Sequence, residues 1–285
     1  MKTGIVTYAY KRFDAAEGAR IIKAHGYDGI DYQRLVDTET ELFALDERGF
    51  EAALRAEAAV YREAGLEIFQ AHGPWRYPPQ DATATDRAER FEKMSRAVRG
   101  AAYLGSPYLV IHPLMPFGSH SDREPDAQWE INLEFMSRLA EVGREYGVTV
   151  CFENMPFREL PLSPVSEILR MVETVNSDFF GVCLDTGHCA VLGHSPADGV
   201  RLVGKEHLKA LHVHDNGGER DSHWLPGTGV IDWSDFSASL KEIGFEGAVS
   251  IETGVTRFVT DGSDTDPHER ELAAFARRIA ENKMN

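Results

Sequence analysis

Acidic and imidazole side chains recur at the ends of short apolar stretches in this chain of 285 residues. A purely structural strand would simply turn at these points, whereas residues of these types bind metals or transfer protons. Six of them are spread over the chain: His72, His112, Glu153, Asp185, His212 and Glu252. A single histidine there is more often an ordinary hydrogen-bonded group. The recurrence, and not any one residue, points to a shared site.

Three of the six are carboxylates, and their charges decide what the site would hold. If Glu153, Asp185 and Glu252 lie close together they repel, and the pKa of each rises unless a cation neutralises them. A divalent metal removes the conflict. The mixture of oxygen and nitrogen ligands suits Mn²⁺ or Zn²⁺, which we favour, as well as Co²⁺ or Mg²⁺. We expect one ion, and additional ligands would allow up to three.

A short turn motif follows one of these stretches, Asp185-Thr186-Gly187-His188. The turn would let Asp185 and His188 face one site, with Gly187 giving the backbone freedom. The alternative is a capped helix start with a solvated histidine.

Two further pairs could add to the same site. His212 and His214 lie two residues apart on a strand and therefore share a face, which we take to be the inward one. The sequence does not decide which of the two is a ligand. Asp221 and His223 precede Pro226-Gly227-Thr228-Gly229 in a long loop and would close over the site, although a polar loop tip is the more ordinary interpretation.

The elements that must position these residues alternate between strand and helix. Eight β-branched or apolar runs predict strands at residues 4–8, 29–33, 67–72, 108–112, 149–153, 180–185, 208–214 and 248–252. Between them lie patterns with helical spacing, including residues 87–104, 132–146 and 267–281. Two long loops, residues 113–127 and 215–231, follow the fourth and seventh strands. Repeated βα units of this kind predict a parallel sheet.

We therefore predict an α/β protein, a single (β/α)8 TIM barrel in which residues 1–285 form one domain. Closure of a barrel brings the carboxyl ends of its strands together, so the polar residues above would surround one opening. The rival fold is a doubly wound open sheet. That fold usually carries a glycine-rich phosphate turn after the first strand, whereas this chain has Ala9-Tyr10-Lys11-Arg12 there.

Composition limits the partners. The net charge of −16 disfavours nucleic acid, because nonspecific affinity for it comes from clustered lysines and arginines. A small sugar-like molecule is the expected partner, and a homo-oligomer is compatible with the sequence. No apolar run reaches the roughly 20 residues of a membrane span, and we expect no secretory signal in the first residues. With three cysteines, an odd number, we expect a reduced, cytoplasmic protein.

Several motifs resemble those of the xylose-isomerase-like barrel superfamily, which holds sugar and sugar-phosphate isomerases and epimerases together with endonuclease IV-type DNA repair enzymes. The stretches that carry the resemblance cover nearly the whole chain: Ala71-His72-Gly73, Val110-Ile111-His112-Pro113, Cys151-Phe152-Glu153-Asn154, Gly181-Val182-Cys183-Leu184-Asp185-Thr186-Gly187-His188, Leu211-His212-Val213-His214-Asp215 and Ser250-Ile251-Glu252.

The resemblance implies roles for individual residues. Glu153, Asp185, His212 and Glu252 match the four ligands of the single metal in ketose 3-epimerases, in which the two glutamates also act as acid and base. His188 matches a position that contacts substrate oxygen. In the repair endonucleases the matching positions hold three zinc ions. The further ligands that such a set requires are also present here: His72, His112, His188, Asp221 and His223.

We therefore expect a metal-dependent isomerase or epimerase of a sugar, sugar phosphate or related keto compound, which transfers a proton through a metal-stabilised enediolate. His214, Arg220 and Trp75 are weaker candidates for substrate contacts. The alternative is a three-zinc phosphodiesterase, such as an endonuclease IV-like AP endonuclease. A third hypothesis is a metal-stabilised barrel that binds a sugar without converting it.

Overall fold

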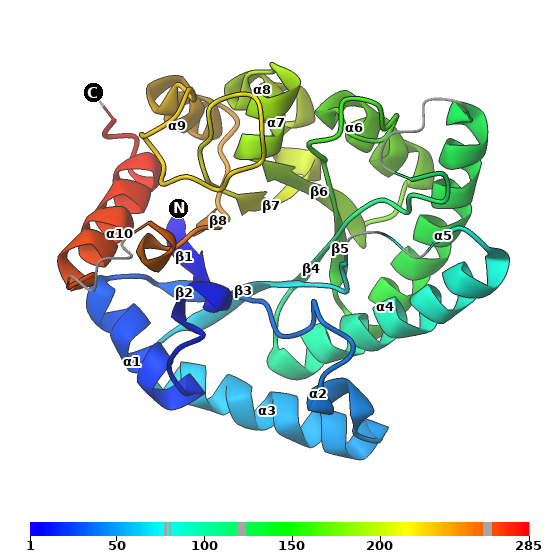
Figure 1. Cartoon of the computed structure of the whole chain (residues 1–285), viewed down its shortest axis with the longest axis horizontal. Coiled ribbons are helices and arrows are strands. Elements are labelled where there is room, and N and C mark those ends of the chain that lie inside the picture. The colour runs from blue at the N-terminus through cyan, green and yellow to red at the C-terminus, as the bar shows by residue number, and fades with distance from the viewer. Residues whose placement is uncertain (77–78, 80, 119–123, 259–263, 285) are drawn as a thin grey trace.

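A computed structural model of the chain describes residues 1–284 except 77–78, 80, 119–123 and 259–263. Eight parallel strands form one sheet in the order β7-β6-β5-β4-β3-β2-β1-β8. Figure 1 shows this sheet curled around a central axis with helices outside it. The strands are β1 (Lys2–Val6), β2 (Gly29–Tyr32), β3 (Glu67–His72), β4 (Tyr108–Ile111), β5 (Thr149–Glu153), β6 (Phe180–Asp185), β7 (Leu208–His212) and β8 (Ala248–Ile251).

The two ends of the sheet meet just beyond the named strands. Val213 bridges to Ile251 in parallel, its N–H donates to the Ser250 carbonyl at 2.8 Å, and the Glu252 N–H donates to the Val213 carbonyl at 3.0 Å. The sheet is thus a nearly closed barrel. The predicted single (β/α)8 barrel is confirmed, and the open doubly wound sheet is wrong.

Helices link successive strands and cover the outside of the barrel (Figure 1). They are α1 (Ala15–His25), α2 (Glu41–Ala44), α3 (Glu47–Glu63), α4 (Ala84–Leu104), α5 (Pro125–Tyr146), α6 (Val165–Val175), α7 (Thr186–Leu192), α8 (Pro196–His207), α9 (Trp233–Glu242) and α10 (Asp266–Ala280), with the 3₁₀ turns η1 (Thr7–Tyr10) and η2 (Val255–Arg257). Among the described residues no helix combines the length and the hydropathy that crossing a membrane requires.

Helix α4 begins three residues before the predicted start at residue 87. Thr83 and Asp86 form a reciprocal capping box, in which the Thr83 side chain accepts from the Asp86 N–H and the Asp86 carboxylate accepts from the Thr83 N–H. Both bonds satisfy backbone donors that a helix start leaves unpaired. The apolar pattern used for the prediction begins only at Phe91, so it could not locate this polar first turn.

Two predicted strands end two residues earlier than expected. Residues 7 and 8 belong to η1 and not to β1, and the Thr7 hydroxyl accepts from the Gln33 N–H at 3.0 Å. Strand β7 ends at His212. Beyond it, His214 forms hydrogen bonds with the hydroxyl of Thr186 through both its N–H and its carbonyl, at 3.1 and 2.7 Å. In both places a side chain replaces a strand neighbour and ends the ladder.

Packing inside the barrel determines where the polar side chains of the site lie. One layer of small and medium side chains forms a separate buried cluster of Val110, Cys151, Cys183 and Ala210. Because side chains alternate along a strand, residues two positions further on point to the same side: His112, Glu153, Asp185 and His212. The apolar layer therefore forms a floor directly beneath four polar residues. All three cysteines are buried and form no disulfide.

Candidate metal centre

Four side chains at the carboxyl ends of neighbouring strands meet at the top of this floor. Glu153 ends β5, Asp185 ends β6, His212 ends β7 and Glu252 follows β8. Each offers one ligand atom, and these atoms all lie within 4.8 Å of one another. The Nδ1 atom of His212 is 2.6 Å from Glu153 Oε1 and 3.3 Å from Glu252 Oε2. The four residues predicted to share a site are thus adjacent; their binding of metal stays a prediction.

The chemistry of this donor set fits a divalent cation. Two ligands of one ion at the usual bond length of roughly 2.1 Å stand at most about 4.2 Å apart, and about 3.4 Å apart in a tetrahedral site. The widest separations, up to 4.8 Å, must therefore contract slightly, and the 2.6 Å contact of His212 with Glu153 must lengthen. Glu153 and Asp185 are buried and Glu252 is half-buried, and carboxylates of like charge this close together are stable only when positive charge offsets them. The fit holds for Zn²⁺ and Mn²⁺ alike.

The two glutamates differ in their electrostatic surroundings. Burial alone would raise the pKa of Glu153, but the neighbouring His212 and His112 hold it well below its ordinary value. Burial raises the pKa of Glu252, and His212 and His223 only partly offset this. The pKa values of the two glutamates are thus shifted in opposite directions, an asymmetry of the kind that acid–base pairs use.

Asp31 fixes the orientation of His212, and the sequence prediction missed it. The Asp31 Oδ2 atom accepts from His212 Nε2 at 2.9 Å and from the Gln70 amide at 2.9 Å. Its Oδ1 atom accepts from the Gln33 amide at 3.1 Å. With Nε2 engaged, His212 presents Nδ1 to the glutamates, as expected for a ligand oriented by an outer carboxylate. The available signal was a charged residue between Ile30 and Tyr32 in a buried strand.

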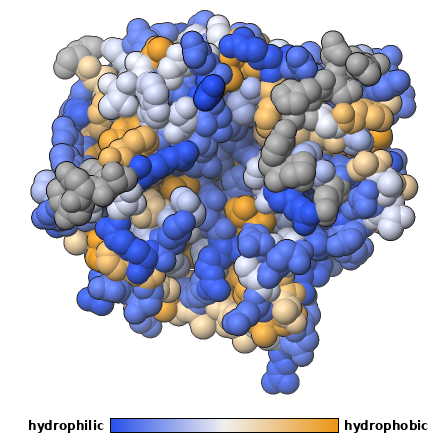
Figure 2. Space-filling model, in the orientation of Figure 1, coloured by the Kyte–Doolittle hydropathy of each residue, from blue (hydrophilic) through white to orange (hydrophobic). Residues whose placement is uncertain are grey.

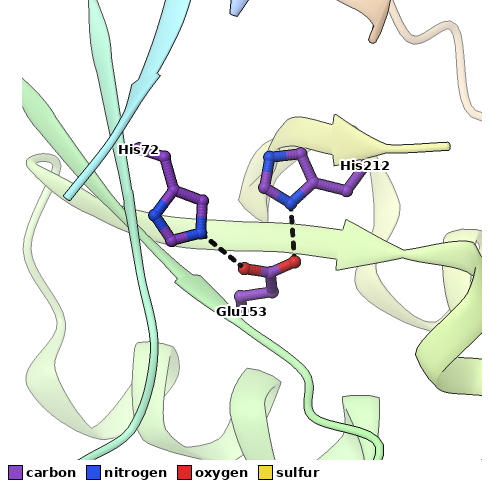
Figure 3. A group of neighbouring side chains, drawn as sticks. All are labelled: His72, Glu153 and His212. Carbon is purple, nitrogen blue, oxygen red and sulfur yellow. Dashed lines mark hydrogen bonds and ion pairs between the residues drawn. The ribbon is translucent and has the colours of Figure 1, made fainter. Parts of the chain in front are cut away.

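Two further histidines flank Glu153 on the side toward β3 and β4. His112 Nε2 is 2.8 Å and His72 Nε2 is 3.7 Å from Glu153 Oε2; Figure 3 shows His72 and His212 each directed at a different oxygen of this carboxylate. The His72 Nδ1–H donates to the Gly73 carbonyl at 2.9 Å, so Nε2 points inward. Burial lowers the pKa of His112 to about 4 despite Glu153. A neutral imidazole is the form that binds metal.

A third group lies on the other side of Asp185. His214 Nε2 is 3.0 Å from Asp185 Oδ2 and 3.5 Å from Asp221 Oδ1. His188 and His223 approach Asp221 Oδ2 through their Nε2 atoms at 3.4 and 3.1 Å. His212 and His214 thus both point inward, as we expected, but they serve different groups. Asp221 and His223 do close over the site.

The turn after β6 is a capped helix start, but its histidine, His188, is buried and not solvated. Asp185 is the N-cap of α7 and accepts from the His188 N–H at 2.6 Å, while its other oxygen faces His214. The expected reason for Gly187 was wrong. Its φ is not positive, and a Cβ atom there would lie 1.9 Å from His214 Cε1. The glycine is needed for space beside an imidazole.

Asp215 anchors the loop that carries Asp221 and His223. Its buried Oδ2 atom accepts from the N–H groups of Gly227 and Gly229, each at 3.0 Å, and from the Trp233 indole at 2.9 Å. Within the loop His223 has a φ of 46°, which a histidine seldom adopts. Its Nδ1–H donates to the Glu252 carbonyl at 2.8 Å. The loop thereby fixes His223 against the end of β8.

Seven of these residues line one cavity of about 320 Å³ at the mouth of the barrel: His72, His112, Glu153, His188, Asp221, His223 and Glu252. Figure 2 shows this face hollowed near its centre, with hydrophilic residues around most of the hollow. Trp75 lines the cavity, and its ring centroid is 4.4 Å from that of His112. Arg220 is exposed and is not among the described residues that line this cavity.

Residues 19–279 match the family model described as the xylose isomerase-like TIM barrel. The chain belongs to this family. The resemblance carried by the sequence motifs is thereby confirmed, and it extends over most of the barrel.

Curated members of the xylose isomerase-like family align with large parts of the chain. An uncharacterized protein of Methanocaldococcus jannaschii is 33% identical over 61% of this chain and 62% of its own length. An inosose isomerase of Bacillus licheniformis is 28% identical over 58% and 60%. A D-psicose 3-epimerase of Ruminiclostridium cellulolyticum is 25% identical over 76% and 78%. The chain thus spans about three fifths of the first two relatives.

Solved structures of xylose isomerase-like barrels cover the whole fold. A D-psicose 3-epimerase crystallised in the presence of D-fructose superposes with a TM-score of 0.78, at 20% identity, over 98% of this chain and 99% of the other. The IolI protein with a bound zinc atom superposes with a TM-score of 0.74, at 18% identity, over 99% and 98%. At these identities the likeness concerns the fold alone.

Proposed function

We propose that this protein is a divalent-metal-dependent isomerase or epimerase of a keto sugar or sugar phosphate. The observation that carries the proposal is the meeting of Glu153, Asp185, His212 and Glu252 within 4.8 Å at the mouth of the barrel. Family membership supports it, since an inosose isomerase and a D-psicose 3-epimerase are among the relatives.

Those four side chains would hold the ion. When bound, a divalent cation supplies a Lewis acid for a carbonyl and an adjacent hydroxyl of the substrate. Asp31 keeps Nδ1 of His212 directed at the site through the 2.9 Å bond to Nε2. The His112 and His72 imidazoles face Oε2 of Glu153, whereas His212 faces Oε1.

Glu153 and Glu252 form the proton-transfer pair. Both line the cavity, and both lie within 3.3 Å of His212 Nδ1. One carboxylate removes the proton from the carbon beside the carbonyl, which gives an enediolate. The other returns a proton on the opposite face for epimerisation, or at the adjacent carbon for isomerisation. Their opposite pKa shifts suit this division.

His188 would bind a substrate oxygen. Its Nδ1–H donates to the Asn154 carbonyl at 2.6 Å, which leaves Nε2 facing the cavity beside Asp221. Trp75 lines the same cavity and offers an apolar surface on which a sugar ring can pack.

Proton exchange tests the function. The metal-loaded protein is incubated with a panel of ketoses in heavy water, and deuterium at the carbon beside the carbonyl is measured by NMR. We expect incorporation with wild type, and a loss of about a thousandfold or more with Glu153→Gln or Glu252→Gln. Glu145→Gln, at an exposed position of α5, is the matched control and keeps wild-type exchange. If a ketose binds but no ketose exchanges its proton, the proposed catalysis is wrong and the protein binds a sugar without converting it.

A second candidate function rests on the flanking groups. Asp185, His188 and His214, and separately His214, Asp221 and His223, form further clusters with metal-ligand spacing, as do His72, Glu153 and His212. Three zinc ions held in this way would suit phosphodiester hydrolysis. Metal content per folded chain distinguishes the two functions. One ion together with carbon-bound exchange supports the isomerase, whereas three ions and cleavage of a phosphodiester support the hydrolase.

A further inference from the structure

A second cavity of about 640 Å³ opens beside the metal centre. It shares Gln33, His223 and Glu252 with the cavity described above, so the two are parts of one cleft. A volume of this size is in the range of pockets that hold metabolites. A substrate bound at the metal centre therefore has room to extend in this direction.

The far part of this second cavity is cationic. Among its described lining residues are Lys11, Arg12 and Arg257, and the one carboxylate among them is Glu252 at the metal centre. All three cations are exposed. The whole chain has a net charge of −16, so the local balance is opposite to the overall one. We refer to Lys11, Arg12 and Arg257 as the cationic rim.

The fold brings the rim together from the two ends of the chain. Lys11 and Arg12 follow η1, which leaves β1, and Arg257 ends η2, which follows β8. Strands β1 and β8 are hydrogen-bonded neighbours, as the blue and orange strands in Figure 1 show. The segments that leave these two strands therefore reach the same part of the mouth.

Two of these cations donate hydrogen bonds to uncharged hydroxyl groups. Lys11 Nζ donates to the Tyr8 hydroxyl at 3.0 Å and lies 4.1 Å from the centre of its ring. Arg12 Nη2 donates to the Thr265 hydroxyl at 3.4 Å. Within the described part of the chain none of the three forms an ion pair, whereas Arg201 alone contacts three carboxylates. The rim thus keeps its charge available for a ligand.

Two cations of the rim, Lys11 and Arg257, act on the hydroxyl group of Tyr8. The hydrogen bond and charge of Lys11 lower its pKa, and the charge of Arg257 adds to the effect. Tyr8 also lines the second cavity, and it is 60% exposed. A lysine and an arginine from opposite ends of the chain therefore act on one hydroxyl in the wall of the cleft.

We propose that the cationic rim binds an anionic group, a phosphate monoester or a carboxylate, at the end of the substrate remote from the metal centre. This inference rests on the proposed function and narrows its substrate class to an anionic keto sugar. Arginine forms paired hydrogen bonds with such groups, and lysine adds a compact charge. Because the protein as a whole is acidic, an anionic group is attracted mainly to the rim. The rim would therefore favour binding with the anionic end of the substrate at the rim and the keto group at the metal centre.

Matched substrates and variants test the inference. Exchange in heavy water is compared for a ketose, its terminal phosphate ester and the corresponding sugar acid, and binding of each to metal-loaded protein is measured by calorimetry. We expect wild type to prefer one anionic compound to the neutral ketose by at least about tenfold in kcat/KM. Lys11→Met and Arg257→Gln should each reduce this preference by about tenfold. Lys241→Met, an exposed lysine on α9, is the charge-matched control and should leave it unchanged.

The outcomes separate the two proposals. Equal kcat/KM for anionic and neutral ketoses, or rim variants that lower both equally, would overturn the cationic subsite while leaving the isomerase intact. Absence of exchange from every compound would overturn the function. In that case calorimetry still decides about the rim: binding of the phosphate ester or sugar acid that weakens in Lys11→Met supports the subsite, and binding that does not weaken contradicts it.

Discussion

The close packing of Gly187 against His214 can be tested by substitution. A Cβ atom there would lie 1.9, 2.4 and 2.7 Å from three atoms of the His214 ring. To restore an ordinary contact the ring would have to retreat by about 1.5 Å. His214 is fully buried, stacks on His223 with ring centroids 3.9 Å apart and bonds to Asp185 at 3.0 Å. Gly187→Ala therefore displaces a ring that has no free space behind it.

The expected cost combines two opposing effects. Alanine stabilises a helix by about 1 kcal/mol relative to glycine, whereas forcing extra atoms into a packed interior costs about 1–3 kcal/mol. The lost hydrogen bond to Asp185 adds about 1 kcal/mol or more. We expect a net loss of about 2 kcal/mol, which lowers Tm by roughly 4–8 °C in a protein of this size.

Thermal unfolding and a double-mutant cycle measure this effect. Gly18→Ala is the matched control, because a Cβ atom in that helix meets only Phe13 and Tyr10 carbons at 3.8 and 3.9 Å; its Tm should stay constant or rise. In a His214→Ala background the clash is gone, so Gly187→Ala should become neutral or stabilising. Equal loss of stability in both backgrounds would show that His214 does not occupy the space beside Gly187.

Three other predictions concern separate parts of the molecule. Asp31→Asn should weaken metal binding by about 10- to 100-fold, because it loosens the orientation of His212; unchanged affinity in a metal titration would contradict this. Asp215→Ala should destabilise the protein by about 3 kcal/mol, since it removes the acceptor of the buried Trp233 indole and of the Gly227 and Gly229 N–H groups, and a denaturant titration with a wild-type midpoint would refute it. Burial would raise the pKa of Asp28, but its ion pair with Arg277 holds the pKa below the ordinary value. The stability advantage of wild type over Asp28→Asn should thus be full above roughly pH 4 and disappear as the pH falls through the lowered pKa; an advantage that persists in stronger acid would be inconsistent with this pairing.

Much of the barrel could be predicted because its strands are buried and its helices are amphipathic. The ends of β3, β5 and β6 fall where the apolar runs end. These ends are also where Glu153 and Asp185 stand, so the same pattern located the strands and the site. The errors at β1 and β7 come from hydroxyls, Thr7 and Thr186, that replace ladder partners. No local pattern in the sequence reports such a contact.

The residues that escaped prediction act through contacts between distant segments. Asp31 is isolated within its strand, and its role appears only when β2 and β7 are seen to direct it at His212. The cationic rim joins residues separated by most of the chain, and Lys11 and Arg257 look like ordinary loop residues in the sequence. Gly187 was noticed for the wrong reason, since its neighbour His214 comes from another strand end.

Anomalous diffraction from crystals grown with Mn²⁺ or Zn²⁺ tests the central claim most directly. The account predicts a strong peak bounded by Glu153, Asp185, His212 and Glu252, with ligand distances of roughly 2.0–2.3 Å, and no such peak in crystals of Asp185→Asn. An empty space between these four side chains, or a peak that persists when Asp185 is replaced, would contradict it.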